Sequence, residues 1–231
     1  MNTILHRIAS VAAMALLLAL LAQPASARFI GDPAPDVKKG QMAVIGEYDG
    51  MGVPVKIDYP QTCGTGFFAT VCVGGAVNTA WGWSHIGGGI SYGISDTLSV
   101  NGDLSIATLN TGGMEFGGGA KMALTTMKLG GKDAKIAAFG QFHSGSATGM
   151  SWTDIDLGGG LSLPIDNKIR VYGGAFLMLF SGTIVTIPFS GTSPLSLYGG
   201  GSYAIDNKIT VGGELHLLGE SGFAFFGQYK L

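Results

Sequence analysis

The chain has 231 residues and a formal net charge of −2, which gives it no electrostatic basis for binding nucleic acid. Charged residues make up 12% of the sequence, about half the usual share, and its 40 glycines are more than twice the average. A disordered chain would be richer in charge, and collagen needs glycine at every third position. The composition therefore indicates an ordered protein that does without a charged surface.

Residues 1–27 have the three parts of a secretory signal peptide. Arg7 supplies the positive charge, Ile8 to Ala22 form the apolar run, and Ala25-Ser26-Ala27 provide the small residues of a cleavage site. The apolar run has 15 residues, whereas a spanning helix needs about 20. We therefore expect cleavage after Ala27 and a single domain over residues 28–231.

The two cysteines, Cys63 and Cys72, lie close together in the segment CGTGFFATVC. An exported protein reaches a compartment in which disulfides persist, so these residues predict a disulfide, with a pair of free thiols as the alternative. No histidine lies near them, which gives no metal-binding pattern. We expect the surrounding stretch, near residues 51–80, to be an extracellular loop.

Four segments repeat one pattern: 86–106, 116–142, 157–179 and 198–218. In each, a glycine triplet begins a run that leads to a turn, and a second run of alternating residues follows. The turns include Asp206-Asn207-Lys208, whose residue types suit the tight bends of hairpins, and the turn of the 116–142 segment is expected to be longer. The repeating unit is therefore predicted to be a β-hairpin.

The second run of each hairpin alternates between apolar residues and residues that are polar or small. In residues 209–217, for example, one face holds Ile209, Val211, Gly213, Leu215 and Leu217. Both a soluble β-sandwich and a membrane barrel produce such alternation. Runs of about 10 to 14 residues, turns that are alternately short and open, and the scarcity of charge favour strands that cross a membrane.

The last nine residues, FAFFGQYKL, alternate up to Leu231 and resemble the C-terminal assembly signal of bacterial outer-membrane β-barrels. The hairpins with their Ile-Asp-Asn-Lys-Ile turns are similar to those of small OmpA-like and OmpW-like outer-membrane proteins. One departure is the final leucine, where those proteins usually have phenylalanine. The resemblance implies an antiparallel up-and-down transmembrane β-barrel in the outer membrane of a Gram-negative cell. It also implies contact with outer-membrane lipid and, through the last strand, with the assembly machinery.

An even number of strands with both ends of the barrel chain in the periplasm is typical of such barrels. The alternation predicts ten strands, with eight or twelve as alternatives if residues 53–75 or 181–190 pair differently. They lie near residues 40–49, 81–94, 97–108, 113–125, 134–143, 149–163, 168–180, 194–204, 208–218 and 221–231.

Polar residues on the inward face are the candidates for a site. The predicted registers put an acidic set with all three histidines of the mature chain at the outer mouth and a basic set in the inner half. The acidic set is Glu47, His85, Glu115, His143, Asp154, Glu214 and His216; the basic set is Lys121, Lys135, Arg170 and Lys230. Tyr172 and Phe176 are expected to cover glycines of the lumen, unless those glycines serve only to curve the strands.

Three interpretations of the acidic and histidine set remain open: a hydrated network that stabilises the barrel, a path for small hydrophilic solutes or cations, and a metal or catalytic site. His143 beside Ser144 and Ser146 is a weak sign of a hydrolase, and the glycine triplets precede no helix that could bind phosphate. We therefore expect a protein without enzymatic activity, metal or cofactor, structural or porin-like, with adhesion through its extracellular loops as the alternative.

Overall fold

The computed structural model describes residues 29–65, 70–107 and 112–231, so the predicted signal peptide lies outside the described residues. No helix in this part of the chain is long and apolar enough to span a bilayer. The fold is all-β, with strands β1 (Met42–Thr65), β2 (Thr70–Gly93), β3 (Leu98–Ala107), β4 (Gly113–Leu129), β5 (Lys132–Ala147), β6 (Met150–Pro164), β7 (Ile169–Ile184), β8 (Ile187–Gly191), β9 (Leu195–Ala204), β10 (Ile209–Leu218) and β11 (Ser221–Lys230).

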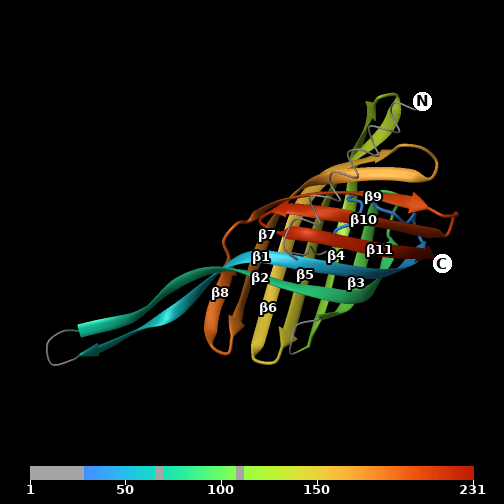
Figure 1. Ribbon diagram of the computed structural model, residues 1–231. Helices are drawn as coiled ribbons and strands as arrows, with labels where there is room; N and C mark the ends of the chain where they lie inside the picture. Colours follow the sequence, from blue (N-terminus) through green and yellow to red (C-terminus); the bar gives the residue numbers. More distant parts are fainter. Residues whose placement is uncertain (1–28, 66–69, 108–111) are drawn as a thin grey trace.

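The strands form one antiparallel sheet that closes into a barrel (Figure 1). Strands β1 to β7 pair in chain order, β7 then pairs with β9, and β11 pairs with β1 from Ala43↔Lys230 to Gly52↔Ser221. These ten strands are the ones that the alternation predicts. The eleventh, β8, was missed: it is a short strand that pairs with the end of β7 and with Val55 to Ile57 of β1 at the outer end of the barrel.

Polar turns at the inner end of the barrel reverse the direction of the chain between the two strands of a hairpin. The carboxylate of Asp206 accepts hydrogen bonds from the backbone N–H groups of Lys208 and Ile209, both at 2.7 Å, and Asp166 makes the equivalent pair. These bonds stabilise the charged carboxylate and lower the pKa of both aspartates. The prediction of a longer turn near residue 130 is wrong. Gly130 and Gly131, with φ of 59° and 80°, form a tight turn at the tip of a longer hairpin.

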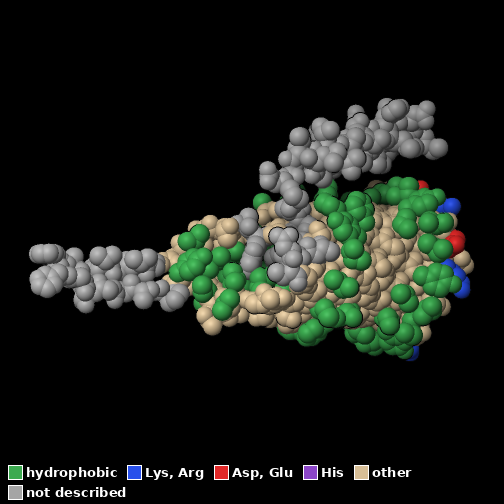
Figure 2. Space-filling model, turned by 60° about the horizontal axis from the view of Figure 1, so that its bottom comes forward, with side chains coloured by type: hydrophobic (Ala, Val, Ile, Leu, Met, Phe, Trp, Pro, Cys, Tyr) green, Lys and Arg blue, Asp and Glu red, His purple; other side chains and the backbone are tan. Residues whose placement is uncertain are grey.

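Apolar side chains cover the outside of the barrel, as Figure 2 shows for one face. Eight of the largest on this surface are 51% to 61% exposed: Ile86, Leu104, Ile106, Met114, Phe116, Leu157, Leu177 and Leu217. In that view the visible charged side chains lie at one end of the barrel. At the inner end Lys168 and Lys208 lie over the rings of Tyr203 and Tyr229, as in the aromatic girdles of outer-membrane barrels. A closed sheet with an apolar outer face is the architecture of a barrel that spans a membrane.

Glycines on the inward face make room for aromatic rings. A Cβ at position 158 would lie 2.5 Å from the Cβ of Phe176, and one at position 200 would lie 2.8 Å from the ring of Tyr172. Tyr198 packs edge-on against Phe176, with ring centroids 6.1 Å apart. The expectation that Tyr172 and Phe176 cover lumenal glycines is confirmed, and the result is a solid aromatic layer on one side of the lumen.

Strands β1 and β2 continue past the rim of the barrel as a two-stranded arm, residues 58–65 and 70–84 (Figure 1). The pairing of β1 with β8 ends at Ile57 and that of β2 with β3 begins at His85, so between these points the two strands pair only with each other. Residues 51–80 are therefore not the open loop that the sequence predicts. Proline and glycine interrupt the alternation there, but they do not stop the backbone from pairing.

Candidate functional site

A segment of nine residues, 29–37, enters the barrel from its inner end and occupies the inner half of the lumen; we call it the plug. Ile30, Asp32, Ala34 and Val37 are no more than 4% exposed. The ring of Phe29 packs on that of Phe226, with centroids 4.4 Å apart. The plug is thus buried as thoroughly as a protein core.

Side chains of the barrel wall bind the backbone of the plug. Glu214 accepts hydrogen bonds from the N–H groups of Ile30 at 2.6 Å and Gly31 at 2.9 Å. Lys121 donates to the carbonyl oxygens of Ile30 at 2.6 Å and Asp32 at 3.0 Å. Backbone N–H and C=O groups in a non-polar interior need hydrogen-bond partners. These four bonds supply partners to a segment that is not itself part of the sheet.

Two aspartates of the plug interact with Arg170 near the inner rim. The carboxylate of Asp32 accepts hydrogen bonds from Ser162 at 2.7 Å and Arg170 at 3.0 Å, and Asp36 lies 3.8 Å from Arg170. Burial and the neighbouring charge of Asp32 raise the pKa of Asp36 to about 6. The ion pair between Asp32 and Arg170 therefore holds the plug in place. Because the docked state raises the pKa of Asp36, docking is strongest when the Asp36 carboxyl is protonated.

Buried pairs of histidine and carboxylate occupy the outer half of the lumen. Nδ1 of His85 lies 2.7 Å from Asp49, and its Nε2 lies 3.7 Å from Glu115, which also accepts a hydrogen bond from Trp152 at 2.5 Å. His216 lies between Glu214 at 3.0 Å and Glu220 at 3.2 Å. The His85 network joins four strands, β1, β2, β4 and β6, from inside the barrel, whereas the His216 network joins β10 to the turn that follows it.

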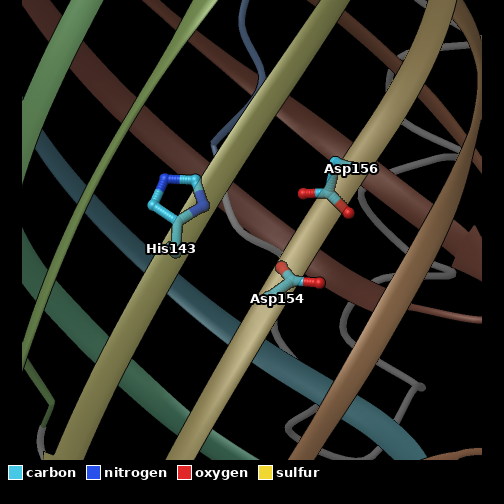
Figure 3. Close-up of side chains that lie close together, drawn as sticks. All are labelled: His143, Asp154 and Asp156. Atoms are coloured by element: carbon cyan, nitrogen blue, oxygen red, sulfur yellow. The ribbon is translucent and has the colours of Figure 1, made fainter.

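His143 of β5 and Asp154 and Asp156 of β6 form a third group (Figure 3). One ligand atom from each of the three residues lies within 4.8 Å of the others, and all three side chains are buried. A ring nitrogen of His143 faces the two carboxylates in Figure 3, and its Nε2 lies 3.5 Å from Asp103. Imidazole and carboxylate are ligand types of zinc and manganese, and they also form ordinary ion pairs with cationic groups.

All seven residues of the predicted outer set face the lumen, and six of them are buried, Glu47 being half-buried. The structure places them in separate hydrogen-bonded networks rather than in one cluster at the mouth of the barrel. Glu214 also accepts hydrogen bonds from the plug. In the basic set Lys121 and Arg170 bind the plug, whereas Lys135 and Lys230 are half-buried at the inner end. Whether any of these residues has a functional role beyond structure stays a prediction.

The serines expected beside His143 do not join it. Residues 143 and 144 point to opposite faces of β5, and the Ser144 hydroxyl donates to the carbonyl of Trp152 at 3.4 Å. Ser146 lies on the same exposed face as Ser144. A histidine that activates a serine must lie within hydrogen-bond reach of it, so the hydrolase interpretation loses its geometric basis.

Several residues of the site were not predicted. Asp49 and Asp156 could have been found, because they continue the inward alternation two residues beyond Glu47 and Asp154, whereas Glu220 lies in the turn after β10, where alternation assigns no face. The plug had no signal in the sequence, since its partners in the barrel wall lie 89 to 184 residues away along the chain. The predicted disulfide involves side chains outside the described ones, but Cys63 and Cys72 are direct register partners across the arm.

With the plug in place, little space remains. One space in the lumen, lined by Phe29, Lys121, Gln141, His143 and Phe226 among others, has a volume of about 40 Å³. That space holds a few water molecules at most. The plug and the aromatic side chains thus fill much of the inner half of the lumen.

No protein-family model matches the sequence, and no curated protein matches it. Among solved structures, the fold is similar to an outer membrane channel from Pseudomonas putida F1, with 9% identity over 88% of this chain and 99% of the other, at a TM-score of 0.42. It is also similar to the outer membrane protease OmpT from Escherichia coli, with 10% identity over 83% and 97% of the two chains and a TM-score of 0.42. Ail of Yersinia pestis is 11% identical over 84% and 99%, with a TM-score of 0.30. Likeness at this level says nothing of function; the barrel architecture is established by the strand pairing of the chain itself.

Proposed function

We propose that the protein is a closed, non-enzymatic outer-membrane barrel that presents the β1–β2 arm as a binding element at the cell surface. The observation that carries this proposal is the arm itself, which extends from a barrel whose lumen is filled. Eight residues of β1, 58–65, pair only with β2. At about 3.3 Å per residue they reach roughly 25 Å beyond the wall.

The arm has the chemistry of a strand-pairing surface. Residues 59–84 contain no Asp, Glu, Lys, Arg or His. Each of the two strands has one edge with no neighbour among the described residues, and natural proteins usually protect such edges with charge. An extended strand with an open edge binds another by adding backbone hydrogen bonds, so the partner we infer is an exposed strand, first of all the arm of a second copy.

Clustering of vesicles tests the proposal. Mature protein is inserted into two sets of liposomes that carry a fluorescence donor or acceptor, and energy transfer is measured after mixing. In the key variant residues 58–76 are replaced by Asn-Gly, a two-residue turn that joins the register partners Ile57 and Val77. We expect the intact protein to cluster the vesicles and this variant to lose clustering.

A matched control shortens the other protruding hairpin, by replacing residues 127–134 with Asn-Gly between the partners Thr126 and Lys135. This control should cluster like the intact protein. Equal clustering with and without the arm, or none by the intact protein, contradicts the proposed role of the arm. Discrete single-channel currents from the intact mature protein in a planar bilayer contradict the closed barrel and would favour the porin-like alternative.

A further inference from the structure

We propose that a groove on the lipid-facing side of the barrel wall binds one anionic phospholipid of the leaflet at the inner end. Lys132 and Lys168 hold the phosphate, and a furrow over Gly201 holds part of an acyl chain. The inference goes beyond the proposed role of the arm and does not depend on it. It depends on the barrel spanning a bilayer, as its closed sheet and apolar outer face indicate.

The polar part of the groove lies at the inner rim, beside the turn between β6 and β7. It has a volume of about 340 Å³, and Lys132, Asn167 and Lys168 line it with exposed groups that donate hydrogen bonds. The ammonium group of Lys132 donates to the carbonyl oxygen of Ile165, so this lysine reaches the turn from the tip of the β4–β5 hairpin. Two ammonium groups and an amide from two hairpins therefore surround one space.

The polar part of the groove has a surplus of positive charge. One carboxylate, that of Asp166, also lines it, and its Oδ1 accepts hydrogen bonds from the backbone N–H groups of Lys168 and Ile169, both at 2.7 Å. The carboxylate of Asp133, next to Lys132 in the chain, pairs with Lys128 at 2.6 Å. Two lysines against one aspartate thus leave one positive charge to complement the negative charge of a lipid phosphate.

The ring of Tyr203 joins the polar part of the groove to an apolar part. The Nζ atom of Lys168 lies 5.7 Å from the centroid of this ring. Tyr203 and Ile169 line both parts, and their side chains are 44% and 40% exposed. Tyrosine is typical of the boundary between acyl chains and headgroups, so the lysines beside Tyr203 lie at the depth of the phosphates.

Glycine forms the floor of the apolar part, a furrow of about 610 Å³. Gly201 of β9 lies opposite Val171 of β7 and opposite Gly213 of β10, so two neighbouring outward positions have no side chain. The large apolar side chains around this floor are 37% to 55% exposed: Ile169, Val171, Tyr203, Val211 and Phe225. A hydrocarbon chain over Gly201 therefore has apolar contacts on both sides. Each part of the groove falls in the range of about 300 to 1,000 Å³ that is usual for ligand pockets.

The outer end of the barrel has little of this chemistry. Among the described Lys and Arg residues Lys56 alone lies there, and it pairs with Asp58 at 2.9 Å. The cationic groups that can attract a lipid phosphate therefore lie at the inner end, which is why we assign the lipid to the leaflet on that side.

Native mass spectrometry of the mature protein in detergent tests the inference. The folded barrel is titrated with dioleoyl phosphatidylglycerol, and separately with dioleoyl phosphatidylcholine, which has the same acyl chains and no net charge. We expect one tightly bound phosphatidylglycerol per barrel and at least fivefold weaker binding of phosphatidylcholine. Lys132→Gln and Lys168→Gln should each weaken the binding of phosphatidylglycerol about fivefold, which corresponds to about 1 kcal/mol per lysine.

Matched variants separate the groove from the rest of the barrel. Lys208 is an exposed lysine in the turn between β9 and β10, and its Nζ lies 5.5 Å from the ring centroid of Tyr229, but it does not line the groove. Lys208→Gln should therefore bind phosphatidylglycerol within twofold of the wild type. Gly201→Leu fills the furrow and should weaken binding at least fivefold. Gly46→Leu, at an outward glycine of β1 where a Cβ meets nothing within 4 Å, should not change it. Gel mobility with and without boiling confirms that each variant is folded.

Equal losses of affinity in Lys168→Gln and Lys208→Gln would overturn the inference, because the rim as a whole would then attract the lipid. Equal affinity of the wild type for the two lipids would overturn the role of the lysines. Wild-type affinity in folded Gly201→Leu would overturn the role of the furrow.

Discussion

The barrel and its arm share the strands β1 and β2, yet the two regions are stabilised in opposite ways. Inside the ring every strand has a neighbour on both sides, and the lumen is filled by the plug and by aromatic rings over glycines. Beyond Ile57 the same β1 has one neighbour, and a two-stranded ribbon is only marginally stable in water. The comparison teaches that closure and filling stabilise the barrel, while the described strands of the arm keep open edges that could pair with a further strand.

The largest effect is expected where a ring fills the space above a glycine. Gly158→Val puts a branched side chain into the position of Phe176 and the carbonyl of Ala175, 2.5 and 2.6 Å from a Cβ, and should cost about 3 kcal/mol or prevent folding. Gly46→Val is the control, because a Cβ there meets nothing within 4 Å. Urea unfolding in detergent, followed by tryptophan fluorescence, measures both. Equal stability of the two variants would contradict the packing described here.

Removing the anchor of the plug should have the next largest effect. Asp32→Ala takes away the partner of Ser162 and Arg170, at 2.7 and 3.0 Å. Breaking a buried ion pair costs 3 to 5 kcal/mol, and since the Arg170 side chain is 37% exposed we expect about 2 kcal/mol. A lysine-specific protease cuts the folded mature protein after the exposed Lys38 or Lys39, and faster release of the nicked N-terminal peptide, followed by mass spectrometry, is the readout. Lys39→Gln, at an exposed position, should not change that rate, and a wild-type rate in Asp32→Ala would refute the anchor.

The arm should depend on its cysteines, whereas the barrel should not. Cys63 and Cys72 are directly opposite in register, and backbones at that separation suit a disulfide. Cys63→Ser should then destabilise the arm by about 2 kcal/mol. Cleavage of the arm by chymotrypsin should accelerate, with no change in the boiling-dependent gel mobility of the barrel. Two free thiols in the oxidised wild-type protein, detected by alkylation, would rule out the bridge.

The smallest effect concerns pH. Docking raises the pKa of Asp36 from its usual value of 3.8 to about 6. At a pH between these two values the Asp36 carboxyl is therefore protonated in the docked plug and ionised in the undocked segment. Docking should therefore weaken as the pH rises from 4 to 6 and stay constant above that. At pH 7.5 Asp36→Asn should slow release of the nicked peptide by on the order of tenfold. A release rate in the wild type that does not change between pH 4 and pH 7 would contradict this assignment.

The sequence predicts the barrel well because its signal is local. Alternation of period two locates ten strands, and the Asp166 and Asp206 turns identify the inner end. Strand β8 was missed because it spans five residues and contains Pro188. The arm was taken for a loop because Pro54, Pro60 and several glycines break the pattern, although the strands pair through these positions apart from an irregularity between Tyr59 and Thr62.

The site was predicted only in part, for a different reason. The inward face identifies lumenal residues such as His85 and Glu115, because alternation assigns each residue to a face. It does not identify what fills the lumen. Residues 29–37 contain two prolines and no alternation, and every partner that holds them comes from a distant strand. Only the three-dimensional arrangement shows that this stretch is the plug.

A cross-link between the plug and the wall tests the central claim most directly. In a background of Cys63→Ser and Cys72→Ser, Asp32→Cys and Ser162→Cys replace two side chains whose oxygens lie 2.7 Å apart. After oxidation and cleavage by the lysine-specific protease, the N-terminal peptide should remain covalently attached and leave only when a reductant is added. Departure of the peptide without reductant, from barrels that keep their boiling-dependent mobility, would show that the lumen does not hold the plug.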